Sequence, residues 1–211
     1  MKIVFFGDSI TDAGKCEEYF EYTYGQGFLG FIAGQLLSEN PLKYQILNRG
    51  IGGNKSVDLY ARIKQHVWEE APDVLSILVG VNDLWHDLFH ARGVDIVRFE
   101  KVYRAIIEET LEKFPKIKII VCEPFILEGE STSPKYEEFL EIKDYAAVVA
   151  KLAKEYGLYF LPFQKVLDEK AKEFPAECWL WDGVHPTRAG AKLYADEWLK
   201  LFKEKVLKDM E

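Results

Sequence analysis

Five short apolar runs, separated by longer segments with helical periodicity, constrain the fold of this chain more than any other feature. The apolar runs, which we interpret as strands, are residues 2–6, 44–47, 74–79, 117–122 and 158–161. Helices are predicted for residues 27–37, 57–68, 99–114, 139–156, 166–174 and 189–207. Apolar strands that alternate with helices are typical of a parallel sheet covered by helices on both faces. The sequence therefore predicts an α/β fold with a five-stranded parallel sheet.

The chain is predicted to form a single domain over residues 1–211. This length is sufficient for one substantial hydrophobic core, and no internal repeat or low-complexity linker divides it. Residues 128–134, which are rich in Glu, Gly and Ser and include a proline, predict the longest surface loop.

Net charge, apolar stretches and cysteine content limit the partners and the cellular compartment that we expect for this chain. A formal net charge of −8 disfavours nucleic acid and anionic membrane surfaces, because both would repel the chain at long range. No apolar stretch has the length of a membrane span or of a secretory signal. Cys16, Cys122 and Cys178 are odd in number and lack C-x-x-C spacing, which favours free thiols. We expect a cytoplasmic protein that acts on a small molecule.

Polar segments follow the first three predicted strands. Gly7-Asp8-Ser9 follows the first, residues 48–53 follow the second, and Gly80-Val81-Asn82-Asp83 follows the third. In open parallel sheets the ligand site lies outside the carboxyl ends of the strands. We therefore expect these three segments to meet at one edge of the sheet.

A serine and an Asp/His pair are candidates for nucleophilic catalysis. Serine is a poor nucleophile at neutral pH and needs a base, which in turn needs a carboxylate to orient it. Ser9 is the candidate nucleophile, and the spacing of Asp182 and His185 lets one short loop present both partners. The alternatives are that Ser9 only caps the next helix and that the Asp/His segment is an exposed loop.

The same strand ends offer hydrogen-bond donors for an oxyanion. Glycines in the segment 48–54 suit a tight turn with exposed backbone N–H groups, and Asn82 adds a side-chain amide. Neither of the common glycine-rich phosphate-binding motifs is present. The alternative for Asn82 and Asp83 is an Asx turn or a helix cap.

Together these segments resemble the SGNH (GDSL-type) hydrolase superfamily over nearly the whole chain. Its characteristic residues match Ser9, Gly53, Asn82, Asp182 and His185 in order. Segments 6–12, 80–85, 124–129 and 181–186 are similar to the intracellular acetylxylan-esterase-like branch.

This resemblance implies a flavodoxin-like three-layer α/β/α fold and a serine esterase that needs neither metal nor cofactor. Ser9 would attack the ester, with His185 as base and Asp182 orienting it. The backbone N–H groups of Ser9 and Gly53 and the Asn82 amide would form the oxyanion hole. The implied substrates are acetyl esters of xylan fragments or related sugars, and association into a homo-oligomer is left open.

Residues next to these segments are candidates for substrate contact. Trp85 and Trp181 are either core residues or platforms for the apolar faces of sugar rings, and Asp8 is a further candidate. His86 and His90 lie four residues apart, as metal ligands on a helix can, but no third ligand is assignable. We interpret this pair as solvated or at the substrate rim, and we predict no metal site.

Two other functions remain open. A thioesterase or lysophospholipase-like enzyme would use the same residues but would need a continuous apolar groove beside Ser9. A non-catalytic carbohydrate-binding protein would not be expected to keep both Ser9 and His185.

Overall fold

A parallel five-stranded sheet forms the centre of the computed structural model, which describes residues 1–15 and 24–210. The strands are β1 (Lys2–Gly7), β2 (Gln45–Gly50), β3 (Val74–Leu78), β4 (Lys118–Cys122) and β5 (Tyr159–Leu161). Every neighbouring pair runs parallel, in the order β2-β1-β3-β4-β5. The predicted parallel sheet is confirmed, and its strand order is that of flavodoxin-like folds.

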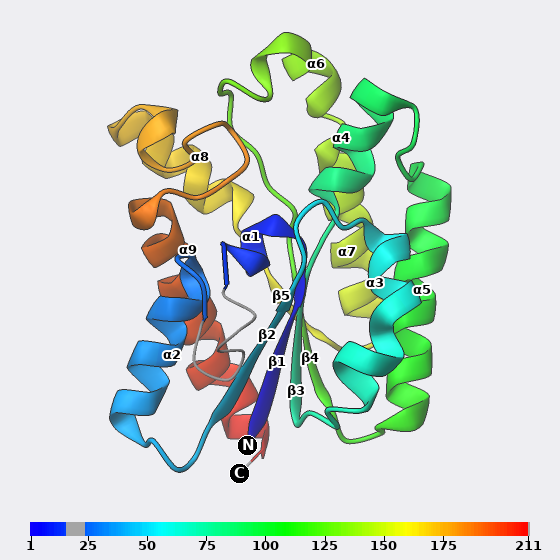
Figure 1. Ribbon diagram of the computed structural model, residues 1–211, viewed down its shortest axis with the longest axis vertical. Helices are drawn as coiled ribbons and strands as arrows, with labels where there is room; N and C mark the ends of the chain where they lie inside the picture. Colours follow the sequence, from blue (N-terminus) through cyan, green and yellow to red (C-terminus); the bar gives the residue numbers. More distant parts are fainter. Residues whose placement is uncertain (16–23, 211) are drawn as a thin grey trace.

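Helices cover both faces of the sheet and complete the predicted three layers (Figure 1). On one face lie α2 (Phe28–Glu39) and α9 (Arg188–Leu201), which pack against each other. The other face is covered by α3 (Ser56–Ile63), α5 (Ile96–Lys113) and α7 (Ile142–Glu155). The remaining α-helices are α1 (Ser9–Asp12), α4 (Val81–His90), α6 (Tyr136–Phe139) and α8 (Gln164–Glu173).

The strand order places a topological switch point at β1, which pairs with β2 on one side and with β3 on the other. The connection from β1 leads to β2 on one side, and the connection from β2 crosses over to β3 on the other side, so a crevice opens at the carboxyl ends of these strands. The segments that follow β1, β2 and β3 begin at Asp8, Ile51 and Val79. The predicted meeting of the three polar segments at one sheet edge follows from this order.

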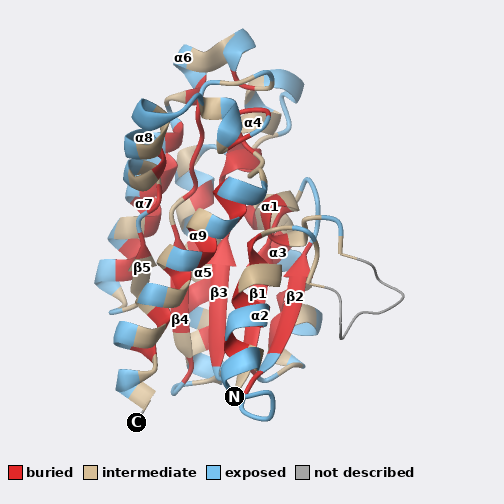
Figure 2. Cartoon of the chain, turned by 90° about the vertical axis from the view of Figure 1, so that its left-hand side faces the viewer, coloured by how far each residue is buried: buried red, intermediate tan, exposed pale blue. Residues whose placement is uncertain are grey.

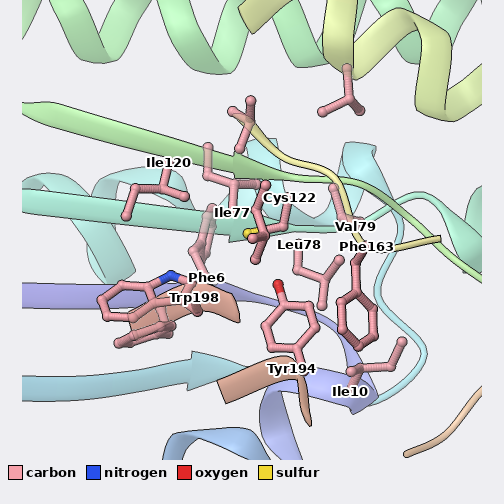
Figure 3. Packing of buried hydrophobic residues seen from close by; sticks show 14 of the residues in the cluster. Phe6, Ile10, Ile77, Leu78, Val79, Ile120, Cys122, Phe163, Tyr194 and Trp198 are labelled. Carbon is pink, nitrogen blue, oxygen red and sulfur yellow. The ribbon is translucent and has the colours of Figure 1, made fainter. Parts of the chain in front are cut away.

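The core occupies both faces of the sheet, whose strands are almost entirely buried (Figure 2). Tyr194 and Trp198, one helical turn apart on α9, point toward the sheet (Figure 3). The Trp198 ring lies 4.9 Å from that of Phe5, and its indole N–H donates to Ser76 Oγ at 3.0 Å. Because this polar tip is paired, the largest side chain of the core is buried without an unsatisfied donor.

The sequence prediction missed helix α4 and the full length of β2. Strand β2 continues through Asn48 and Arg49 to Gly50, although these residues were predicted to lie in a loop. Asn48 faces residue Phe5 in the ladder, and its side-chain amide donates to the Thr11 carbonyl at 2.9 Å. Polar residues thus occupy a buried strand because their side chains find partners that only the tertiary structure supplies.

Several predicted helices are also interrupted. The predicted helix 139–156 breaks between α6 and α7, where the N–H groups of Glu141 and Lys143 bond three residues back instead of four. The predicted helices 57–68 and 189–207 both end in π-helical turns, Lys64–Trp68 and Phe202–Val206. Hydrophobic periodicity does not distinguish these turns from regular helix.

Two further sequence expectations are addressed by the described residues. None of their helices combines the length and apolar character needed to cross a bilayer. Cys122 is a buried free thiol and Cys178 an exposed one, whereas Cys16 lies outside the described residues.

Candidate active site

Ser9 is the first residue of α1 and lies directly after β1 and Asp8. The N-cap of α1 is Asp8, whose carboxylate accepts from the Ile10 N–H at 3.0 Å, so the capping interpretation does not apply to Ser9. The Ser9 hydroxyl is left free to bond elsewhere, and its Oγ lies 2.8 Å from His185 Nε2.

The segment 182–186 holds an Asp–His pair rather than an exposed loop. Asp182 is buried, and its Oδ2 lies 2.8 Å from His185 Nδ1. Its Oδ1 accepts from the backbone N–H groups of Val184 at 2.9 Å and His185 at 2.7 Å. These bonds fix the carboxylate relative to the imidazole ring. They also favour the tautomer with a proton on Nδ1, which leaves Nε2 to accept from Ser9.

The two partners stabilise each other's charged form. Burial opposes ionisation of Asp182, but hydrogen bonds from the His185 ring, the His185 N–H and the Val184 N–H lower its pKa to about 2. Burial would by itself lower the pKa of His185, but the bond to Asp182 and the charges of Asp182 and Asp8 raise it. A hydroxyl, an imidazole and an ionised carboxylate therefore form one hydrogen-bonded sequence, which is the arrangement that activates a serine.

The segment that follows β4 supports Asp182. Residues 128–134 were predicted to be a surface loop, but Thr132 is completely buried. Ser131 donates through Oγ to Asp182 Oδ2 at 3.2 Å and through its N–H to the Asp182 carbonyl at 2.8 Å. The Leu127 N–H donates to the Gly183 carbonyl at 2.9 Å. The predicted surface loop is present, since Glu128, Glu130, Ser133 and Pro134 are exposed, but its inner side packs directly on the Asp182 turn.

The glycine-rich segment after β2 lies beside Ser9. A Cβ built on Gly52 would be 3.9 Å from the Cβ of Ser9, and the Gly52 N–H donates to Asp12 Oδ2 at 3.1 Å. Gly53 has φ +75°, a conformation that side chains with a Cβ rarely adopt. The backbone conformation of the turn therefore requires glycine at position 53.

Asn82 meets this segment from α4. Its side-chain N–H donates to the Asn54 carbonyl at 3.1 Å. The interpretation of Asn82 and Asp83 as helix caps does not hold, since the N-cap of α4 is Gly80. The structure thus brings Asn82 to the residue that follows Gly53, on the same segment that lies beside Ser9.

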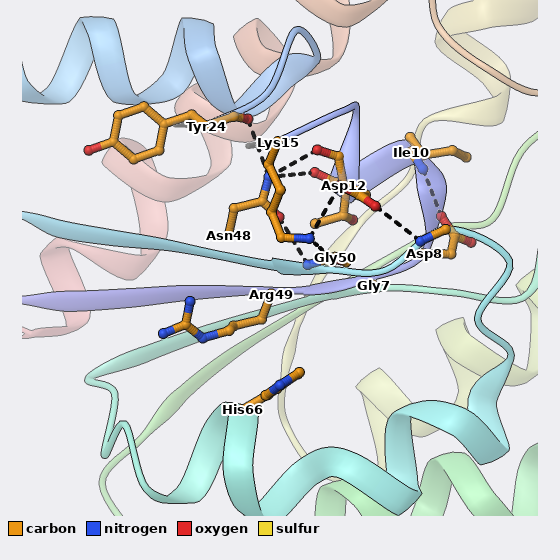
Figure 4. A network of polar contacts seen from close by, with 12 residues as sticks. Gly7, Asp8, Ile10, Asp12, Lys15, Tyr24, Asn48, Arg49, Gly50 and His66 are labelled. Carbon is orange, nitrogen blue, oxygen red and sulfur yellow. Dashed lines mark hydrogen bonds and ion pairs between the residues drawn. The ribbon is translucent and has the colours of Figure 1, made fainter. Parts of the chain in front are cut away.

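Polar contacts beneath the site fix α1 against the end of β2 (Figure 4). Lys15 Nζ bonds the Gly50 carbonyl at 2.5 Å and Asp12 Oδ1 at 3.2 Å. A Cβ on Gly50 would lie 2.2 Å from the Asp12 nitrogen, so only glycine permits this approach. The short helix that carries Ser9 is therefore held close to the glycine-rich segment.

Asp8 lies under the site and not on its surface. Its side chain has no exposed area, and one carboxylate oxygen has no hydrogen-bond partner. Burial raises its pKa to about 7, against the hydrogen bond from Ile10 and the charges of His185 and Arg62. Asp8 was a candidate for substrate contact, but a carboxylate without exposed surface cannot touch a ligand in this conformation.

A cleft of about 410 Å³ opens beside Ser9 and His185. Trp181 is 58% exposed and stacks on the His185 ring, with centroids 5.6 Å apart. Trp85 is half-buried, lies 6.4 Å from the His185 ring and packs edge-on against Phe139. Of the two tryptophans, Trp181 is thus available as a platform, whereas Trp85 belongs partly to the core.

Arg188 also lines the cleft and was not singled out from the sequence. Its guanidinium donates to the Gln26 carbonyl at 2.6 Å and lies 4.7 Å from the Phe31 ring centroid. Its position three residues after His185 was the only feature of the sequence that pointed to a place in the cleft.

His86 and His90 lie together on α4, with ring centroids 5.6 Å apart. The described residues contain no group of three His, Cys, Asp or Glu side chains able to hold a metal ion. Burial lowers the pKa of His86, and the positive charges of Lys55, Arg92 and His90 act in the same direction. The pair is not uniformly solvated, since His86 is half-buried whereas His90 is exposed.

Comparison with known proteins identifies the family. The model of the GDSL-like lipase/acylhydrolase family matches residues 5–193. The acetylxylan esterase of Geobacillus stearothermophilus is 33% identical over 208 residues, covering 94% of this chain and 92% of that protein. Its structure matches with a TM-score of 0.84 at 31% identity, covering 95% of this chain and 93% of that chain. Catalytic mutants of that relative replace a serine, an aspartate or a histidine with alanine.

Two further relatives agree. A GDSL-like lipase from Parabacteroides merdae ATCC 43184 has a TM-score of 0.89 and 38% identity, covering 97% of this chain and 96% of that chain. An isoamyl acetate-hydrolyzing esterase from Saccharomyces cerevisiae (strain ATCC 204508 / S288c) is 26% identical over 215 residues, covering 95% of this chain and 85% of that protein. The expected superfamily, fold and enzyme class are confirmed: the chain belongs to the GDSL-like lipase/acylhydrolase family and is an ester hydrolase.

Proposed function

We propose that the protein is a serine esterase that removes acetyl groups from acetylated sugars, with xylo-oligosaccharides as the leading candidates. The observation that carries this proposal is the unbroken hydrogen-bond sequence from Ser9 through His185 to Asp182. The catalytic mutants of the Geobacillus relative support it, since its aspartate precedes its histidine by three positions, as Asp182 precedes His185.

In this mechanism Ser9 Oγ attacks the ester carbonyl while His185 Nε2 takes its proton. The negative charge that develops on the carbonyl oxygen is stabilised by the backbone N–H groups of Ser9 and Gly53 and by the Asn82 amide. His185 then protonates the departing alcohol, which leaves an acetyl group on Ser9. Water, deprotonated by His185, hydrolyses this acyl-enzyme. Every proton transfer is assigned to a side chain of the protein, so the mechanism requires neither metal nor cofactor.

The substrate assignment rests on the cleft and on the relatives. Trp181 presents an exposed aromatic face next to His185, which suits the apolar face of a sugar ring. The described lining includes the polar groups Gln26 and Arg188 in addition to apolar residues, which favours a polar alcohol over a long acyl chain. The cytoplasmic location, the single domain and any homo-oligomer stay predictions from the sequence.

The test compares the wild-type protein with Ser9→Ala. The panel consists of acetylated xylo-oligosaccharides, other acetylated sugars, and p-nitrophenyl esters of increasing chain length. Ser9→Ala should lose activity by about 10⁴-fold or more while keeping its circular dichroism spectrum. Ser38→Ala, which changes an exposed hydroxyl on α2, is the matched control and should retain full activity.

Three outcomes would redirect the assignment. Substantial hydrolysis by purified Ser9→Ala would exclude Ser9 as nucleophile. Octanoyl esters turned over faster than acetyl esters would favour the thioesterase or lysophospholipase-like alternative. No ester hydrolysis and no labelling by a fluorophosphonate, despite binding of xylo-oligosaccharides, would indicate a carbohydrate-binding protein.

A further inference from the structure

Arg62, on α3, connects three segments around the candidate site. Its Nη2 donates to the carbonyl of Gly7 at 2.9 Å, and its Nη1 donates to the carbonyl of Arg49 at 2.8 Å. Its Nε donates to Asn54 Oδ1 at 2.7 Å. All three nitrogens of one planar group are therefore engaged, at the end of β1, near the end of β2, and in the glycine-rich segment. Gly7 lies two residues before Ser9, and Asn54 lies one residue after Gly53.

The guanidinium is held in place from other directions as well. Its carbon lies 4.4 Å from the centroid of the Phe6 ring, and Nη1 lies 2.7 Å from His66 Nδ1. Burial lowers the pKa of His66 to about 4, and the charge of Arg62 acts in the same direction. The His66 ring is therefore neutral at neutral pH and accepts at Nδ1. Burial lowers the pKa of Arg62 itself only to about 10, against the charges of Asp58, Asp8 and Asp12. Arg62 is thus a charged donor at neutral pH.

Asn54 links this cation to Asn82. Its side-chain oxygen accepts from Arg62, and its backbone carbonyl accepts one N–H of the Asn82 amide at 3.1 Å. A side-chain amide is planar and carries two donors, so a bond to one N–H also sets the direction of the other. The position of the Asn54 carbonyl therefore determines where Asn82 aims its second N–H.

Residues 51–54 have little apolar packing to hold them in place. They contain two glycines, and Ile51, Gly52 and Gly53 are all exposed. At its start the segment is bonded through the Ile51 N–H to the Gly7 carbonyl at 3.1 Å. At its end the corresponding tie is Asn54 to Arg62, and Arg62 bonds that same Gly7 carbonyl. Both ends of the segment are therefore tied to the Gly7 carbonyl at the end of β1, the first end directly and the second end through Arg62.

We propose that Arg62 and Asn54 are positioning residues that preorganise the oxyanion hole, by fixing the glycine-rich segment and the Asn82 amide relative to Ser9. This proposal rests on the proposed function, which assigns Gly53 and Asn82 to the oxyanion hole. Donors that are already aligned before the reaction stabilise the transition state without a reorganisation cost. Lysine cannot replace Arg62 in this role, since one ammonium group cannot reproduce a planar fork with three separate partners.

The first experiment is a double-mutant cycle between Asn54 and Asn82, measured on phenyl acetate. Asn82→Ala should lower kcat by about 10²–10³-fold. Asn54→Ala should lower kcat by about 10-fold and change KM by less than about twofold. Added to Asn82→Ala, the Asn54→Ala change should cost less than about twofold more, because its effect passes through the amide that is already missing. Asn40→Ala, at the end of α2, is the matched control and should leave kcat unchanged.

The second experiment uses Arg62→Lys, with Arg104→Lys as its control. Arg104 also makes several polar contacts, to Glu100, Glu155 and Tyr156. If both variants fold, only Arg62→Lys should lower kcat. A phenylboronic acid, which forms a tetrahedral adduct with a reactive serine, should then bind more weakly by the same factor as kcat/KM falls. A general structural defect would not produce that proportionality.

The results separate this proposal from the proposed function. If Ser9→Ala and Asn82→Ala are impaired but Asn54→Ala and Arg62→Lys have wild-type kcat, only the positioning roles are excluded. An Asn54→Ala loss that is equal with and without Asn82 would also overturn the proposal, because the effect would not pass through the amide. If Asn82→Ala itself keeps full kcat, the assignment of the oxyanion hole fails, and this inference fails with it.

Discussion

At the scale of single residues, Asp8 affects the pKa of His185 although it does not line the cleft. Its buried charge is one cause of the raised pKa of His185, after the hydrogen bond and charge of Asp182. Asp8 ionises near pH 7 itself because burial raises its pKa to about 7. The proton that His185 must lose before it can act as a base is therefore held more tightly when Asp8 is charged.

This leads to a prediction for the pH–rate profile. In the wild type, the acid limb of kcat/KM should have its midpoint above about 6.5, the ordinary histidine value. In Asp8→Asn, which keeps the acceptor for the Ile10 N–H but removes the charge, the midpoint should move to lower pH. Profiles of both proteins between pH 4.5 and 9 test this, with Asp95→Asn on the exposed start of α5 as control. Coincident profiles for wild type and Asp8→Asn would show that this charge does not act on the base.

At the scale of elements, the segment after β4 acts as a support for the Asp182 turn. Thr132 anchors it, since its hydroxyl donates to the Leu127 carbonyl at 2.8 Å and accepts from the Gly129 N–H at 2.9 Å. The fit is close, because a Cβ on Gly129 would lie 2.4 Å from the Gly183 nitrogen. Loss of the hydroxyl would leave a buried N–H and a buried carbonyl without this partner.

We therefore predict that Thr132→Val lowers the free energy of unfolding by about 1–3 kcal/mol, although the two side chains have similar shapes. It should also lower kcat, because the Asp182 carboxylate is supported by Ser131 of the same segment. Urea denaturation and steady-state kinetics measure the two effects. Unchanged stability together with unchanged kcat would mean that the segment only covers the site.

At the scale of the whole molecule, buried carboxyl groups determine how stability depends on pH. Burial raises the pKa of Asp83 to about 7, against hydrogen bonds from the Ser56 hydroxyl and N–H, and Asp8 is raised to a similar value. Between about pH 4 and 7 the folded protein therefore holds protons on these groups that the unfolded chain has lost. Their contribution to stability is present at low pH and is lost as the pH rises through this window. Asp182 has the opposite sign, since its lowered pKa stabilises the fold above about pH 4, and this contribution is lost as the pH falls toward about 2.

From these signs we predict that the free energy of unfolding is greatest near pH 4 and decreases as the pH rises to about 7. Each raised carboxyl contributes at most about 1.4 kcal/mol per pH unit. Asp83→Asn should flatten this slope even if it lowers the absolute stability. Denaturant titrations at pH 5, 6, 7 and 8 provide the measurement, and equal slopes for wild type and Asp83→Asn would contradict the assigned pKa.

The sequence by itself determined the class of fold, the approximate strands and the positions from which the candidate site is built. These depend on local patterns: apolar runs, helical periodicity and the polar residues at the ends of strands. The placement of Ser9 after β1 and the closeness of Asp182 to His185 follow from such short-range information. The arrangement of parallel strands then required the three polar segments to converge.

Only the tertiary structure decided which polar side chains support the site. The extension of β2 through Asn48, the Thr132 anchor and the engagement of Arg62 with Asn54 all depend on partners that other segments supply. Whether Asp8 or Ser9 caps α1 was likewise decided by how β1 delivers the chain into the helix. A polar residue has the same appearance in a sequence whether it is exposed or buried with a partner. The physical reason is that its free energy depends on the group it meets, and chain folding selects that group over long separations in sequence.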